Sequence, residues 1–283
     1  MKTFQYIYLF FSLILLASCS TDNTDTTVTP VNETAGLIRI KELSNENHTI
    51  ELYSDTGILK QGYNAISLRI KDKTTGQYQT EAAVSWTPVM HMTTMEHSCP
   101  KSPVTKAAGT QFLYTGEIVF QMAQNDTESW TLTIDYTLNG TSYSATDTIA
   151  VFPSEKRTVS SFTGTDGTRY IVAYIAPKNP AVALNDMTVG VFRMENMMSF
   201  PIVDNYKIKI DPRMPGMGNH GSPYNTDLTQ TTPGKLYHGK LSLTMTGYWK
   251  INLQLLNASG QVLKGEPVTT DNPQSSLFFE IEF

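Results

Sequence analysis

The chain has 283 residues, a formal charge of −5 and 40% hydrophobic residues, while only 17% of its residues are charged. This composition excludes a disordered acidic chain and a coiled coil. It also argues against nucleic acid as a partner, because the chain has no excess of Lys and Arg with which to neutralise phosphates.

The first 18 residues have the features of a secretory signal. A basic start precedes an apolar run from Phe4 to Leu16, and small residues stand before Cys19. The run is too short for a convincing membrane-spanning helix. Leu16-Ala17-Ser18-Cys19 resembles the lipobox of bacterial lipoproteins. The resemblance implies cleavage before Cys19 and attachment of lipid to its thiol; the alternative is an ordinary cleaved signal with an incidental cysteine.

A lipid on Cys19 would anchor the protein in the bacterial cell envelope. Ser20 rather than Asp follows this cysteine, which by lipoprotein sorting favours the outer membrane. Residues 20–35 are rich in Thr, Asn and Asp and predict a flexible tether. We therefore expect a lipoprotein signal peptide at 1–18, and a lipidated cysteine with its tether at 19–35.

The sequence from residue 36 onward predicts an all-β fold. Apolar and polar side chains alternate over 66–70, 130–136 and 249–255, which is typical of half-buried antiparallel strands. Asn139-Gly140 and Ser259-Gly260 are hairpin-type turns. Many short strands at this spacing favour an immunoglobulin-like sandwich.

An internal repeat divides this folded part in two. Each copy reads as a strand, a Met-x-x-Met loop with a nearby His, a Tyr-x-Gly strand that ends in Met, and a Trp strand. We therefore predict tandem β-sandwich domains at 36–153 and 157–283. The alignment matches Met92, Met95, His97, Met122 and Trp130 with Met214, Met217, His220, Met245 and Trp249, respectively.

Both loops are rich in soft metal donors. Thioethers suit Cu(I) and contribute little to binding Zn²⁺, Ca²⁺ or Mg²⁺, and neither loop supplies the His, Cys and carboxylate set of a zinc site. The sequence therefore predicts copper sites. The predicted ligands are Met92, Met95, His97, Met122, Met214, Met217, His220 and Met245, with Met90, His91 and Cys99 as further candidates in the first loop.

Each of these residues also has a structural interpretation. Methionine can plug the end of a sandwich or form an adaptable contact surface. Cys99 is either a strong Cu(I) ligand or a small buried residue, since Ser222 takes its place in the second copy. Met122 and Met245 either pack in the core or approach the loops. We expect Met194, Met197 and Met198 in the core or in a loop plug, and His48 and His238 at the surface.

The sequence lacks a catalytic constellation. It has no G-x-S-x-G, H-E-x-x-H or P-loop motif and no EF-hand. No third group that would orient a nucleophile is evident beside His97 and Cys99. We therefore predict a non-enzymatic protein with no catalytic residues and no organic cofactor.

The second copy resembles the YtkA-like domain and the related FixH-type periplasmic domain. The similarity rests on an M-P-x-M loop at 214–220, on Tyr-His-Gly at 237–239, and on an M-x-G-x-W strand at 245–249. The first copy matches more loosely, because residues 92–95 lack the proline. The resemblance implies an immunoglobulin-like fold in the cell envelope and suggests copper handling.

The predicted function is binding of a soft metal, Cu(I), as a carrier or buffer. The predicted partners are the membrane, through the lipid, and a protein of the cell envelope. The alternative is a non-enzymatic surface or protein-interaction module whose Met loops are structural or contact a partner.

Overall fold

The computed structural model describes residues 32–283, and in this range it contains β-strands and one 3₁₀ turn, Pro215–Met217. The predicted signal peptide and Cys19 lie outside the described residues. Residues 33–283 form one compact unit. In the described part of the chain, no helix is long and apolar enough to span a membrane.

The last residues of the predicted tether belong to the folded part. The carboxylate of Glu33 accepts hydrogen bonds from the backbone N–H of Gln111 at 2.5 Å and of Phe112 at 2.9 Å. The backbone N–H of Leu37 donates to the carbonyl of Thr34 at 3.0 Å. These bonds connect residues 33–37, at the end of the predicted tether, to the folded part.

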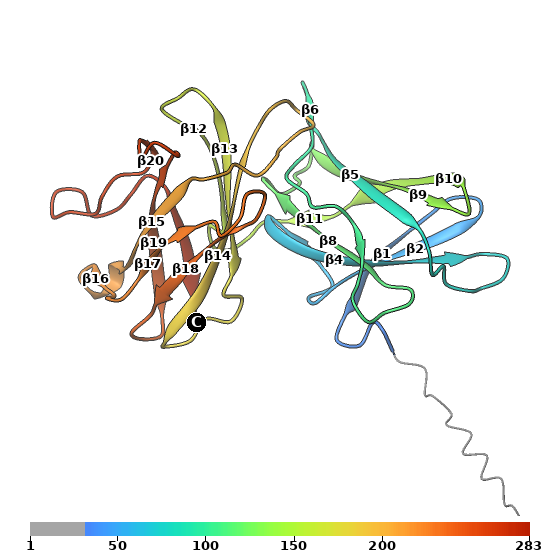
Figure 1. Ribbon diagram of the computed structural model, residues 1–283, viewed down its shortest axis with the longest axis horizontal. Coiled ribbons are helices and arrows are strands. Elements are labelled where there is room, and N and C mark those ends of the chain that lie inside the picture. Colours follow the sequence, from blue (N-terminus) through green and yellow to red (C-terminus); the bar gives the residue numbers. More distant parts are fainter. Residues whose placement is uncertain (1–31) are drawn as a thin grey trace, which may run out of the picture. The chain divides into compact units, whose positions relative to one another are not determined.

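Residues 38–152, the N-terminal half, form two facing layers of strands (Figure 1). One sheet has the order β1-β2-β4-β8-β7, the other β10-β9-β5-β6, and β11 pairs with β3 in parallel. The strands are β1 (Ile38–Ser44), β2 (His48–Ser54), β3 (Leu59–Lys60), β4 (Gly62–Asp72), β5 (Ala83–His91), β6 (Glu96–His97), β7 (Thr105–Lys106), β8 (Tyr114–Phe120), β9 (Ser129–Leu138), β10 (Thr141–Ile149) and β11 (Val151–Phe152).

Residues 159–282, the C-terminal half, form a ten-stranded sheet of order β12-β13-β14-β18-β17-β15-β19-β20, in which β16 pairs with β15 and β21 with β19. The strands are β12 (Val159–Thr163), β13 (Arg169–Ala176), β14 (Leu184–Arg193), β15 (Lys207–Met214), β16 (His220–Gly221), β17 (Thr226–Thr229), β18 (Tyr237–Ser242), β19 (Tyr248–Leu256), β20 (Val262–Lys264) and β21 (Phe278–Glu282).

The pairing order repeats between the two halves. The series β2-β4-β8-β7 recurs as β13-β14-β18-β17, and β9-β5-β6 recurs as β19-β15-β16. This agrees with the repeat in the sequence, although the domain boundaries near residues 153 and 157 stay a prediction. The prediction of an all-β, sandwich-like fold is confirmed.

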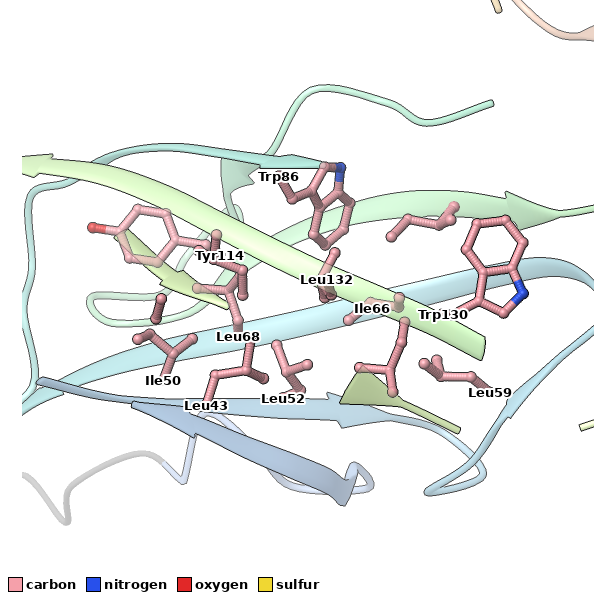
Figure 2. Close-up of a cluster of buried hydrophobic side chains, with 14 of the residues drawn as sticks. Leu43, Ile50, Leu52, Leu59, Ile66, Leu68, Trp86, Tyr114, Trp130 and Leu132 are labelled. Carbon is pink, nitrogen blue, oxygen red and sulfur yellow. The ribbon is translucent and has the colours of Figure 1, made fainter. Parts of the chain in front are cut away.

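The alternating residues form the cores. In Figure 2 the side chains of Leu52 from β2, Leu68 from β4, and Trp130 and Leu132 from β9 point into one apolar cluster. Trp249 is fully buried in the corresponding cluster of the C-terminal half. Burying such side chains is the main stabilising contribution to a fold of this kind. A third, smaller cluster combines Val119, Val159, Ile171, Ala173, Phe192 and Phe200.

The two predicted turns differ in length. Asn139 and Gly140 have φ angles of 49° and 81°, and they join β9 directly to β10 because Leu138 pairs with Thr141. This is the two-residue hairpin geometry that Asn-Gly favours. Gly260 lies in a longer connection, because its flanking pair is Leu256 with Val262.

Candidate functional site

A Met–His cross-strand pair occurs at the same place in both halves. Met90 of β5 lies opposite His97 of β6, and Met214 of β15 lies opposite His220 of β16. Directly opposed residues of an antiparallel pair place their side chains on the same face of the sheet. Each Met/His loop is therefore a tight hairpin with one thioether and one imidazole on the same face of its base.

This register corrects the alignment predicted from sequence. Met90 also pairs with Trp130, and the residue before Met214, Arg213, pairs with the residue after Trp249. Met90 is therefore the counterpart of Met214, and Met92 is not. The sequence alignment left Met90 unmatched because the first hairpin is one residue longer than the second.

The two paired methionines are core residues. Met90 is 0% exposed and Met214 is 5% exposed. The methyl group of Met214 lies 3.2 Å from where a Cβ on Gly247 would stand, and Gly247 has a φ of 118°. This close approach, together with the positive φ, explains the glycine of the M-x-G-x-W strand.

A tryptophan lies beneath each hairpin. The indole N–H of Trp130 donates to the carbonyl of Met122 at 3.1 Å, and that of Trp249 donates to the carbonyl of Met245 at 3.0 Å. These bonds fix the backbones of both methionines beside the loops. The side chains of Met122 and Met245 are half-buried against their cores, so they pack, as one of the two interpretations expected.

His97 is the most confined imidazole of the two loops. It is 8% exposed, and its ring meets that of Trp130 edge-on, with centroids 5.8 Å apart. Its Nδ1 lies 2.7 Å from the carbonyl of Ser98. Because a carbonyl only accepts, Nδ1 carries the proton, and Nε2 of the neutral ring keeps a free lone pair. Its counterpart His220 is exposed.

His91 is directed away from this pair. It opposes Glu96 rather than His97, so its side chain lies on the other face of the hairpin. Nδ1 of His91 is 2.7 Å from the Glu96 carboxylate, and Nε2 is 2.8 Å from the Thr131 hydroxyl. With both nitrogens engaged, His91 does not join the donors around His97.

Cys99 is a buried thiol. It is 1% exposed within the core of the N-terminal half, and burial raises the pKa of its thiol. A thiolate is the form that binds metals or attacks substrates. The structure therefore favours the interpretation of Cys99 as a small core residue.

The tips of both hairpins expose a methionine. Met95 is 46% exposed and Met217 is 59% exposed. The first tip is closed by a hydrogen bond of 3.0 Å from the N–H of Met92 to the carbonyl of Met95. The second tip is the 3₁₀ turn, with Pro215 at its start and a left-handed Gly218 at its end. Met92 itself is half-buried against the core.

The methionines after β14 are not all in the core. Met197 and Met198 are 43% and 47% exposed, whereas Met194 packs against the third apolar cluster. The carbonyl of Met197 accepts a hydrogen bond of 2.7 Å from the N–H of Ser98. This contact places the turn at 194–199 next to the first Met/His loop, a proximity that sequence spacing could not reveal.

The expected surface position of His48 is wrong. His48 is 4% exposed, its Nδ1 lies 3.0 Å from the hydroxyl of Tyr136, and its ring packs edge-on against Tyr143. Burial lowers its pKa and outweighs the opposing effect of Asp72. His238 is exposed, as expected.

The chemistry available at the loops is binding by neutral donors. Among the described residues, no three His, Cys, Asp or Glu side chains gather to hold a metal ion. Thioethers lie outside that class of donors. The N-terminal loop contains the Nε2 lone pair of His97 and the thioethers of nearby methionines. These are the types of donor that a soft monovalent ion prefers.

Comparison with known proteins adds little. No family model matches the chain, and no curated protein matches it. A solved structure of FdeC, an adhesin of Escherichia coli, aligns at 15% identity over 79% of this chain and 64% of that one, so this chain spans less than two thirds of its length. The TM-score is 0.24, too low to support an argument about fold or function.

Proposed function

We propose that the protein is a non-enzymatic binding module of the bacterial cell envelope, anchored in the outer membrane by a lipid on Cys19, whose Met loops contact a partner protein. The observation that carries this proposal is the exposure of Met95 and Met217 at equivalent hairpin tips, 46% and 59% respectively. Thioether side chains are flexible and polarisable, which suits adaptable contacts with a partner.

The two tips are held in a defined position. Met90 and Met214 fix the base of each hairpin in a core, and the short turns between base and tip leave little backbone freedom. A contact residue that is already ordered loses less conformational entropy on binding. The hairpins thus present one exposed methionine each on a rigid base.

Site-specific photo-crosslinking tests this proposal. A photoreactive residue is placed at Thr94 or at Gly216, next to the tips, in cells that make the full chain; a Cβ on Gly216 would meet no atom within 4 Å. We expect a crosslinked partner whose yield falls at least fivefold in the double variant Met95→Glu and Met217→Glu. The matched control, with Leu at both positions, keeps an apolar tip and should retain the crosslink. An unchanged yield in the Glu variant would contradict the proposal.

A second candidate function is Cu(I) binding at the N-terminal loop, as a carrier or buffer. The specific observation in its favour is His97, whose Nδ1–H is bonded to the Ser98 carbonyl while Nε2 has no hydrogen-bond partner among the described residues. A hydrogen bond from the other ring nitrogen to a backbone carbonyl orients a metal-binding imidazole. Met90 opposes His97, and Met92 and Met122 border the same core. When bound there, the ion would be held by these neutral donors.

Titration with Cu(I) under reducing conditions distinguishes the candidates. If His97 is a ligand, His97→Ala should weaken binding at least tenfold, and so should Leu at both Met92 and Met122. Met95→Leu should bind like the wild type, because that tip is exposed. Equal affinity in all variants, or the absence of binding to the wild type, would refute the copper site while leaving the crosslinking result unaffected.

A further inference from the structure

β12 is an edge strand of the sheet in the C-terminal half. It pairs with β13 alone. The N–H of Tyr174 donates to the carbonyl of Thr158, and the N–H of Gly164 to the carbonyl of Thr168, both at 2.8 Å. Even-numbered residues of this segment therefore bond to β13. Because alternate residues of a strand direct their backbone groups to opposite sides, 159, 161 and 163 direct theirs outward.

The two ends of this edge are tied by hydrogen bonds to β21 and β20 of the same sheet, and its middle is open. At one end, the carbonyl of Arg157 accepts from the N–H of Glu280 at 2.9 Å. At the other end, the N–H of Thr165 donates to the carbonyl of Leu263 at 3.0 Å. Between them, a cavity of about 580 Å³ borders residues 159–162. Its size falls within the usual range of ligand sites.

Two residues that line this cavity carry buried polar atoms without hydrogen-bond partners in the described part of the chain. The side-chain amide nitrogen of Gln121 and the hydroxyl of Ser160 are buried and have no hydrogen-bond partner among the described residues. A buried donor without an acceptor costs about 1–3 kcal/mol. The carbonyl groups of an added peptide are acceptors of the kind that these two atoms lack.

The cavity is lined by three cations, Lys156, Arg157 and Lys264, and by two carboxylates, Glu155 and Glu280. Lys156 is paired with Glu282, whereas Arg157, whose guanidinium lies over the ring of Phe278, and Lys264 have no carboxylate within ion-pair distance in the described chain. Glu280, on the same wall, already accepts from the Tyr248 hydroxyl and from a backbone N–H. An occupant that bears a carboxylate side chain is therefore favoured.

The edge lacks two common protections against strand addition, charged side chains and proline. Residues 159–163 are Val-Ser-Ser-Phe-Thr, with neither charge nor proline. The edge strand β1, by contrast, carries Arg39, Lys41 and Glu42. Proteins commonly protect free edges with charges or prolines. An edge that lacks both and borders a cavity has the features of a site for β-strand addition.

We propose that β12 binds an extended, acidic segment of a partner protein, which adds to the sheet as a further strand. The outward N–H and C=O groups of Val159, Ser161 and Thr163 would pair with the backbone of this segment. Its carboxylate would meet Arg157 and Lys264. The site is separate from the Met loops, and the proposal does not depend on the function of those loops.

The experiment selects peptides from a random heptapeptide display library on the full chain in detergent. We expect sequences without proline that are rich in β-branched residues and contain Asp or Glu. Bound peptide should slow hydrogen exchange at the amides of 161 and 163, and should leave 160 and 162 unchanged because β13 already protects them. Ser161→Pro removes one outward N–H and should weaken binding at least tenfold.

Ser161→Ala is the matched control, since it keeps the backbone N–H and should bind like the wild type. Arg157→Glu combined with Lys264→Glu leaves the edge intact and should also weaken acidic peptides at least tenfold. Binding to Ser161→Pro within twofold of wild type, protection at the Met loops instead, or no enrichment of peptides would each overturn the proposal. A dimer that Ser161→Pro abolishes would identify a second copy as the occupant, and would overturn it too.

Discussion

Four of the loop methionines, two at the bases and two at the tips, are expected to separate into two classes when they are changed to alanine. Met90 and Met214 lie at the base of each hairpin with exposures of 0% and 5%, whereas Met95 and Met217 lie at the tips with exposures of 46% and 59%. Their sequence context does not distinguish them. The structure assigns the base residues to stability and leaves the tip residues free for contacts.

The size of the effect follows from burial. Truncating a fully buried methionine removes its transfer free energy and leaves a cavity, at a cost of about 2–5 kcal/mol. For a protein of this size, each kcal/mol lowers the melting temperature by roughly 2–4 °C. Met90→Ala and Met214→Ala should therefore each melt about 4–20 °C below the wild type. An exposed side chain away from other contacts changes stability by about 0.5 kcal/mol or less, so the tip variants should stay within roughly 2 °C.

Thermal unfolding followed by circular dichroism measures both classes. Leucine nearly conserves the volume of methionine, so Met90→Leu should recover most of the loss, at a residual cost below about 1.5 kcal/mol. The reasoning would be refuted if Met95→Ala or Met217→Ala melted as early as Met90→Ala. It would equally be refuted if Met90→Ala melted with the wild type.

Three further outcomes are expected. Burial lowers the pKa of His48, so protonation favours the unfolded chain. The free energy of unfolding should therefore fall as the pH drops below about 6.5, the pKa of histidine in an unfolded chain. In His48→Gln this part of the pH dependence, measured by urea unfolding, should disappear. Trp249→Phe removes the indole N–H bonded to Met245 and should cost about 1–3 kcal/mol in the same assay; a cost near zero would contradict the bond. If the N-terminal loop binds Cu(I), His91→Ala should leave the affinity measured by titration unchanged, whereas His97→Ala should not.

Local patterns predicted the strands well. The Trp strands at 130–136 and 249–255 form the centres of the cores, and Asn139-Gly140 forms a two-residue hairpin. These features depend on neighbours in the sequence, namely period-two alternation and a dipeptide that tolerates positive φ. They could therefore be predicted without knowledge of tertiary contacts.

The positions of the site residues depended on tertiary contacts, which local sequence patterns do not reveal. Spacing matched Met92 with Met214, yet strand register matches Met90 with Met214. A methionine suits a core as well as a loop, so residue type cannot decide between the two. His48 was misplaced for a similar reason, because its partner Tyr136 lies on a strand distant in the sequence. The free edge of β12 likewise depends on the tertiary arrangement, because β13 is its one partner among the described strands.

The hydrogen bond from Ser98 to Met197 makes the two copies of the repeat unequal. It fastens the residue after His97 to the turn that follows β14, so neither segment can shift without carrying the other along or breaking the bond. Two segments joined in this way are thermodynamically linked: whatever orders one alters the free energy of ordering the other by the same amount. The first loop therefore contributes a contact between the halves of a duplicated chain, and loss of this bond would release both segments at once.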